Sequence, residues 1–126
     1  MGVLHLFVCS GRFNSFEEMR SFIDPTYTED GDMMPSEFMK EVKLEEFEPT
    51  CIEAFWEPQP RPLSELLHKS SCAEQWLSQV DPSLSDSQAI CVFEPNQLRE
   101  PTGTSLRYCG SYRYDPQDSV ELDRAH

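Results

Sequence analysis

The clearest strand signal in the chain is Ala89-Ile90-Cys91-Val92-Phe93, a short run of apolar and β-branched residues. A run of this length and composition is typical of a buried strand. Residues 105–114 then alternate between apolar and polar positions, which predicts a second strand that pairs with the first as a hairpin. Further strands are expected at Val3–Val8 and Cys51–Trp56. The sequence therefore predicts a mostly antiparallel sheet of about four strands.

Helix signals lie between these predicted strands. Two capping boxes, Ser15-Phe-Glu-Glu18 and Ser71-Cys-Ala-Glu74, each place a serine three residues before a glutamate. The second box should begin a helix that buries Trp76 in the core. Another helix is expected to begin at Pro35-Ser36, and the prolines of residues 58–62 predict a stiff connector.

The order of strands and helices predicts the fold class. It favours an α+β fold, a two-layer sandwich in which the helices pack on one face of the sheet. The length of 126 residues fits one domain, which we expect to span residues 1–115. Residues 116–126 are expected to form a frayed tail.

The charge is unevenly distributed along the sequence. Thirteen of the 23 acidic residues lie between Glu17 and Glu57 with only three bases, a local balance of 3 − 13 = −10, whereas the whole chain carries −13. Hydrophobic residues at 38% and aromatics at 11% favour a folded chain over a disordered one. An acidic folded surface predicts a basic protein partner and argues against direct binding of nucleic acid or an anionic membrane.

The five cysteines are odd in number, widely spaced and without a C-x-x-C pair. This pattern favours reduced thiols in a cytoplasmic protein. No run approaches the roughly 18 apolar residues of a membrane span. The acidic loop around Gly31 departs from a calcium-binding loop, because Thr26 and Thr28 stand where acids are required. We expect neither a cofactor nor a metal site.

Catalytic patterns are weak in this sequence. None of His5, His68 and His126 has a local nucleophile beside it, and the many carboxylates lie in exposed, charge-rich surroundings. A glycosidase or phosphatase pair needs two acids in a concave, partly apolar pocket. We therefore do not expect an enzyme, although a small carboxylate-dependent enzyme remains an alternative.

The expected binding surface combines acids with an aromatic anchor, as tight protein interfaces do. Trp56, which lies between Glu53 and Glu57, is the expected anchor, either exposed or half-exposed. The candidate partner-binding residues are Glu29, Asp30, Asp32, Glu41, Glu45, Glu46, Glu48, Glu53, Trp56 and Glu57.

Several segments, taken together, suggest a family. After the first strand come Phe13-Asn-Ser-Phe-Glu-Glu18, an acidic loop, Ser36-Glu-Phe38, Leu44-Glu-Glu-Phe-Glu48 and finally Leu106-Arg-Tyr-Cys-Gly-Ser-Tyr112. Over roughly Val3 to Tyr114 this pattern resembles the immunity protein 22 family of bacterial polymorphic toxin systems.

The resemblance implies a cytoplasmic antidote that binds and neutralises a cognate toxin. Many such toxins are nucleases, whose clefts must be basic to hold phosphate, so we expect the acidic surface to occlude such a cleft. The alternative binding role is a nucleic-acid-mimicking regulator of a basic DNA-binding protein.

Overall fold

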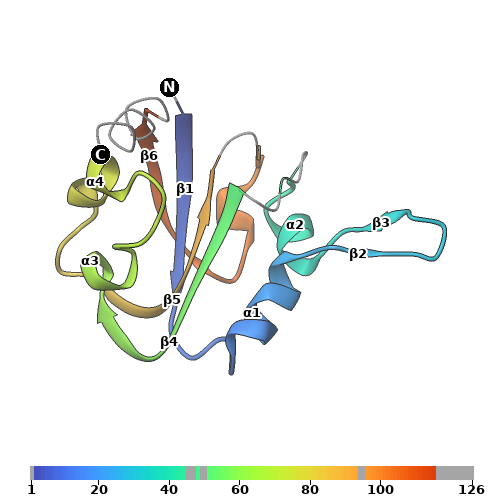
Figure 1. The fold of residues 1–126 in the computed structure, drawn as a ribbon, viewed down its shortest axis with the longest axis horizontal. Helices are drawn as coiled ribbons and strands as arrows, with labels where there is room; N and C mark the ends of the chain where they lie inside the picture. Colours follow the sequence, from blue (N-terminus) through green and yellow to red (C-terminus); the bar gives the residue numbers. More distant parts are fainter. Residues whose placement is uncertain (1, 45–47, 49–50, 94–95, 116–126) are drawn as a thin grey trace, which may run out of the picture.

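The computed structural model describes residues 2–44, 48, 51–93 and 96–115. Figure 1 shows the elements in space. In chain order they are β1 (Gly2–Cys9), α1 (Phe16–Ile23), β2 (Thr26–Tyr27), β3 (Met33–Met34), α2 (Glu37–Glu41), β4 (Ile52–Pro62), α3 (Leu63–Leu66), α4 (Ala73–Trp76), the 3-10 turn η2 (Leu77–Gln79), β5 (Ser85–Val92), the 3-10 turn η3 (Pro101–Gly103) and β6 (Arg107–Tyr114). The predicted tail, residues 116–126, lies outside the described residues.

The central sheet is open, antiparallel and four-stranded within the described residues, in the order β4-β5-β1-β6. Leu6 of β1 stands opposite Cys91 of β5 on one side and Gly110 of β6 on the other. The register of β1 with β6 shifts after Leu6, next to Gly110, whose φ of +124° suits glycine. The predicted α+β class and four-stranded antiparallel sheet are confirmed.

The predicted hairpin of residues 89–93 with 105–114 is wrong, because β1 lies between β5 and β6. The connection from β5 to β6 is too long for a tight turn. β1 is apolar on both faces, with Leu4, Leu6 and Val8 on one and Phe7 on the other. A strand of this kind is best buried at the centre of a sheet.

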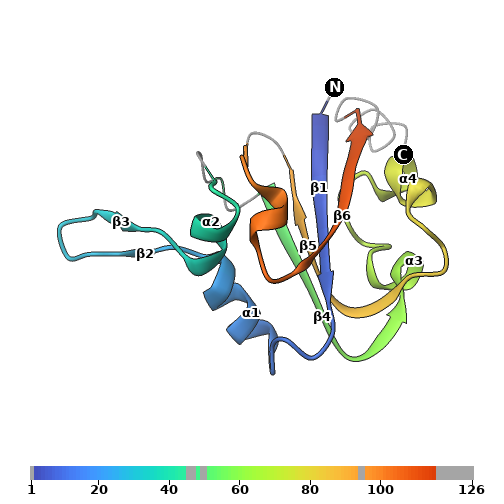
Figure 2. The same ribbon diagram turned by 180° about the vertical axis from the view of Figure 1, so that it is seen from behind.

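Helices cover both faces of the sheet, so the predicted arrangement of helices on one face is wrong in this detail. One core cluster joins Leu6 and Cys91 to Leu67 and Trp76 of the α3–α4 region. The other joins residues such as Phe7, Ile90, Met19 and Phe38, the last two from α1 and α2. Figures 1 and 2 show these two helix pairs on opposite sides of the sheet. The reason is that β1 and β5 carry apolar side chains on both faces, and each face must be covered.

The proline-rich segment 58–62 belongs to β4 and is not a separate connector. β4 is an edge strand, and its pairing with β5 shifts between Trp56 and Arg61. An edge position tolerates proline because one side of the strand needs no backbone donor. The pairing with β5 is therefore interrupted along the prolines and resumes at Arg61 and Pro62, while the chain stays extended.

Two of the three predicted helix starts are confirmed by their caps. Ser15 accepts a hydrogen bond from the backbone of Glu18, and Ser36 accepts one from Met39. The capping box at Ser71 is wrong: Cys72, with φ of +58°, precedes α4 and no side chain caps the helix. Trp76 is fully buried, as predicted.

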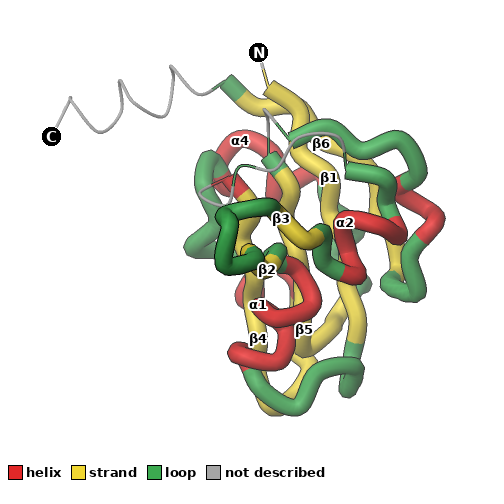
Figure 3. The backbone as a smooth tube through the Cα atoms, turned by 90° about the vertical axis from the view of Figure 1, so that its right-hand side faces the viewer, coloured by secondary structure: helices red, strands yellow, loops and turns green. Residues whose placement is uncertain are grey.

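The strands β2 and β3 form a small hairpin that the sequence did not predict. They pair with each other, Thr26 with Met34 and Tyr27 with Met33. Figures 1 and 2 show the hairpin projecting from the α1–α2 side of the body, and Figure 3 views it from its tip, with α1 and α2 behind it. No helix in the described residues is long and apolar enough to cross a membrane.

Candidate functional site

The tip of the β2–β3 hairpin carries the most exposed group of predicted site residues, Glu29, Asp30 and Asp32. The turn is closed by the backbone N–H of Gly31, which donates to the carbonyl of Thr28 at 2.9 Å. Gly31 has φ of +88°, the left-handed conformation that follows a type I turn in a three-residue hairpin loop. The acids are thus held on an ordered turn.

The hairpin is fixed internally and at its base. Asp32 donates its backbone N–H to the Thr28 side chain at 3.1 Å, and Thr28 donates its own to the Asp32 carbonyl at 2.9 Å. Below β3, the hydroxyl of Ser36 donates to the carbonyl of Ile23 at 2.7 Å in a buried position. This bond ties the end of α1 to the start of α2, so the hairpin projects from a clamped base.

A second group of predicted residues lies between α2 and β4. Glu41 is half-buried and accepts a hydrogen bond from the backbone of Ser105 at 3.2 Å. The backbone of Glu48 is held by Asn96, which accepts from its N–H at 2.7 Å. Glu45 and Glu46 lie outside the described residues, so their place on this surface stays a prediction.

Glu53, on β4, takes part in the fold itself. Its carboxylate accepts hydrogen bonds from the Ser70 hydroxyl at 2.5 Å and from the Ser71 hydroxyl at 2.6 Å. The backbone N–H of Ser71 donates to the same group at 3.2 Å. These bonds anchor the turn before α4 to the edge strand, and they explain why Ser71 does not cap that helix.

Trp56 is half-buried on the α1 side of β4. Its Nε1–H donates to the carbonyl of Phe13 at 3.0 Å, and its ring packs against the core cluster on that face. The ring is therefore held in one orientation with part of its surface in solvent. That state is compatible with the predicted half-exposed anchor, which remains a prediction.

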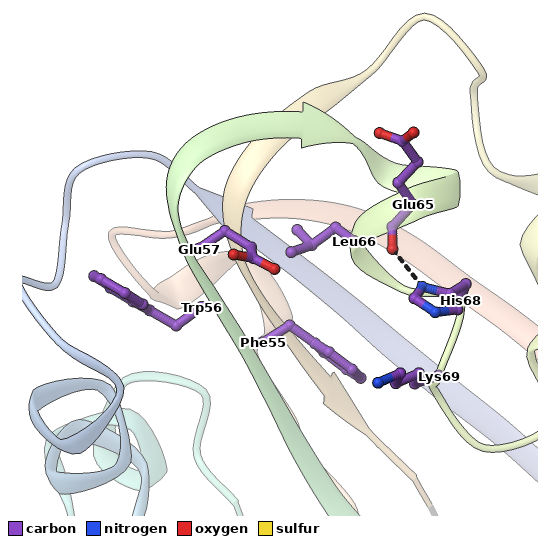
Figure 4. Close-up of a pocket in the computed structure, with 7 residues that line it drawn as sticks. All are labelled: Phe55, Trp56, Glu57, Glu65, Leu66, His68 and Lys69. Atoms are coloured by element: carbon purple, nitrogen blue, oxygen red, sulfur yellow. Dashed lines mark hydrogen bonds between the residues drawn. The ribbon is translucent and has the colours of Figure 1, made fainter.

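Figure 4 shows the side chains around a hollow beside β4 and α3. The volume of this hollow is about 150 Å³. Its lining residues are Phe55, Trp56, Glu57, Glu65, Leu66, His68 and Lys69. The carboxylates of Glu57 and Glu65 point in different directions, and Glu57 lies 3.8 Å from Arg61. The Nδ1–H of His68 donates to the backbone carbonyl of Glu65 at 2.7 Å. The hollow does not present the converging carboxylate pair that glycoside hydrolysis requires.

Three of the five cysteines, Cys9, Cys91 and Cys109, have a thiol pKa above the ordinary value. Burial, with a smaller contribution from Asp86, raises the pKa of Cys9 to about 11. Burial likewise raises the pKa of Cys91 and of Cys109. A raised thiol pKa lowers the thiolate fraction, and the thiolate is the reactive form. None of the five cysteines forms a disulfide.

The sequence-based predictions also concern the histidines and possible metal ligands. His5 is half-buried, with Nδ1 2.9 Å from the hydroxyl of Tyr108, and His126 lies outside the described residues. Across residues 2–44, 48, 51–93 and 96–115, no group of three or more His, Cys, Asp or Glu side chains could hold a metal ion.

The candidate binding residues predicted from the sequence did not include the apolar side chains on the hairpin. Tyr27 is 64% exposed, Met33 44% and Met34 52%. The available signal was Asp30-Gly31, a dipeptide typical of tight hairpin turns, but the flanking strands have only two residues each. The hairpin therefore combines an acidic tip with exposed apolar sides.

Comparison with known proteins gives one result. The family model described as immunity protein 22 matches residues 6–115, which is most of the chain. No curated protein and no solved structure matches it. The chain therefore belongs to the immunity protein 22 family, and its general role is that of a toxin-neutralising immunity protein.

Proposed function

We propose that this protein neutralises a basic toxin, a nuclease, by covering the toxin's active cleft with its acidic surface. The observation that carries the proposal is the concentration of acid between residues 17 and 57, with a local charge of −10. Two of the three bases in that stretch are already engaged. Arg20 pairs with Asp24, and Lys43 lies 2.9 Å from Glu100. Little positive charge is left to offset the exposed acids.

The charge supports a nuclease target because phosphate binding requires Lys and Arg in the nuclease cleft. An acidic surface attracts such a cleft at long range and competes with nucleic acid for it. Pairing across the interface raises the association rate and makes it depend on salt. The surface that we propose comprises Glu29, Asp30 and Asp32 on the hairpin, Glu41 at the end of α2, Glu48, and Trp56 as an anchor. Glu57 is not included, because it lines the hollow with Glu65 and Leu66 of α3.

The proposed role is binding without catalysis, in the cytoplasm. Five cysteines without a disulfide suit a reducing compartment. The raised pKa of the Cys9 thiol and the diverging carboxylates of Glu57 and Glu65 support a non-enzymatic role.

The test uses the toxin domain that we expect to be encoded beside the gene for this chain. We expect it to degrade DNA or RNA, and we expect an equimolar amount of this protein to stop degradation. Glu29→Lys with Asp30→Lys should slow association roughly tenfold and flatten its dependence on salt between about 50 and 200 mM. The matched control, Glu65→Lys with Glu74→Lys, reverses two exposed acids on the α3–α4 side and should bind like the wild type.

The outcomes separate the parts of the proposal. A toxin that is neutralised but cleaves neither DNA nor RNA would contradict the nuclease assignment alone. Equal association rates for the hairpin and control variants would show that the acidic surface does not steer binding. A toxin that is neither bound nor neutralised would contradict the whole proposal.

A further inference from the structure

The β2–β3 hairpin exposes apolar side chains that the fold does not use. Tyr27, Met33 and Met34 are three of the four large apolar residues that are exposed in the described part of the chain; the fourth is Phe16 on α1, at 42%. Every residue from Thr26 to Pro35 is exposed. The three side chains are therefore clustered on one element, whereas single exposed apolar residues elsewhere need no explanation.

The hairpin is ordered without the help of a core. A two-stranded hairpin is marginally stable in water on its own. Here the turn at Gly31, the bonds between Thr28 and Asp32 and the buried bond from Ser36 to Ile23 hold it in place. Figures 1 and 2 show that it extends away from the sheet and does not cover it. An element fixed in this way loses little conformational freedom when it binds.

The side chains suit insertion into a partner. Tyrosine is enriched among the residues that dominate binding energy, and methionine is unbranched and adapts to irregular apolar depressions. Met33 stands opposite Tyr27 in the hairpin, and Met34 follows directly. Tyr27 and Met33 therefore share one face of the hairpin, and Met34 lies on the other, so that apolar side chains flank the projecting hairpin on both faces.

The charge around these side chains defines the chemistry of the partner. Residues 26–35 contain three acids, Glu29, Asp30 and Asp32, and no base. A complementary site has an apolar depression for the three large side chains and Lys or Arg around its rim. A second copy of this chain is a poor match, because both copies would present the same acidic tip.

We propose that the β2–β3 hairpin is the anchoring element of the toxin interface, and that Tyr27, Met33 and Met34 insert into an apolar depression with a basic rim on the toxin. This inference rests on the proposed immunity function and names the part of the protein that supplies the desolvated contacts. The acids at the tip guide the hairpin into place, and the apolar side chains slow dissociation.

The experiment compares two sets of serine substitutions in the full chain. The test variant combines Tyr27→Ser, Met33→Ser and Met34→Ser, and the control is Phe16→Ser. The probe is the toxin domain that we expect to be encoded beside the gene, and binding is followed by biolayer interferometry. We expect the test variant to lose roughly 100-fold in affinity, mainly through faster dissociation. The control should bind within about threefold of the wild type.

Each outcome decides the inference. If the wild type binds the toxin and the test variant binds within threefold of it, the hairpin is not the anchor, although the proposed function stands. If the wild type does not bind, both proposals fail. Circular dichroism and thermal melting establish that the test variant is folded. Sedimentation compares the self-association of the wild type and the test variant. If the wild type self-associates and the test variant does not, the hairpin is a self-association site, and its role as a toxin anchor is overturned.

Discussion

The central strands and the β2–β3 hairpin both pair in an antiparallel way, but the central strands bury their apolar side chains and the hairpin exposes them. In β1 and β5 the apolar residues are buried on both faces, between the α1–α2 and the α3–α4 layers. In the hairpin Tyr27, Met33 and Met34 face solvent. The sheet is built from long-range packing, while the hairpin is held by its own turn and by its clamped base.

This difference implies that the sheet supplies the stability of the fold and that the hairpin is available for binding. Burial of apolar area supplies most of the free energy of folding, so the sheet and its covering helices hold the structure together. Exposed apolar side chains contribute little to folding but become valuable when a partner removes them from water. Substitutions in the two regions should therefore change different measurements.

The largest effect on stability is expected from Trp76→Ala. Trp76 is fully buried, its Nε1–H donates to the carbonyl of Ser71 at 3.0 Å, and its ring lies 5.9 Å from that of Tyr112. Removing the ring leaves a large cavity, so the free energy of unfolding should fall by about 3–5 kcal/mol. Urea denaturation followed by circular dichroism measures this change. A loss below about 1 kcal/mol would mean that the α4 region is not part of the cooperative core.

An intermediate effect is expected from Trp56→Ala, because Trp56 belongs partly to the core and partly to the proposed surface. Loss of its half-buried packing and of the bond to Phe13 should lower the free energy of unfolding by about 1–3 kcal/mol.

Trp56→Phe is the matched variant, since it keeps an aromatic ring and removes the N–H donor. The Phe13 carbonyl would still accept a bond from Gln88 at 2.9 Å, so the cost should be about 0.5–1 kcal/mol. The same denaturation experiment measures both variants. If Trp56→Ala destabilises the protein as much as Trp76→Ala, Trp56 is a core residue and its assignment as an anchor is wrong.

The sequence predicted local elements well and their assembly less well. The strands, the caps at Ser15 and Ser36 and the burial of Trp76 follow from patterns within a few residues. The order of the strands does not, because it depends on which strand is apolar on both faces and so belongs at the centre. The failed cap at Ser71 has a similar cause. A carboxylate 18 positions earlier, that of Glu53, binds its hydroxyl.

The candidate site was predictable in charge but not in shape. Counting acids identified the stretch that includes Glu29, Asp30 and Asp32, and the structure places these three on one exposed turn. The same count could not separate them from Glu53, whose carboxylate is used inside the fold. Strands of two residues give too short a pattern for recognition, so the hairpin and the exposure of Met33 and Met34 were missed.

The smallest effect on stability is expected from the triple variant Tyr27→Ser, Met33→Ser and Met34→Ser. These side chains are largely in solvent already, and the turn bonds of Gly31 and Asp32 involve backbone and Thr28 atoms that the variant retains. The free energy of unfolding should therefore change by less than about 0.5 kcal/mol per site, against the much larger loss for Trp76→Ala. Denaturation in urea measures both under the same conditions.

A loss from the triple variant comparable to that of Trp76→Ala would mean that the hairpin packs on the body in solution, and the contrast between a stabilising sheet and a binding hairpin would be wrong. A variant that is as stable as the wild type but no longer holds the toxin would separate the two regions most clearly, because one set of apolar side chains would then serve folding and the other recognition.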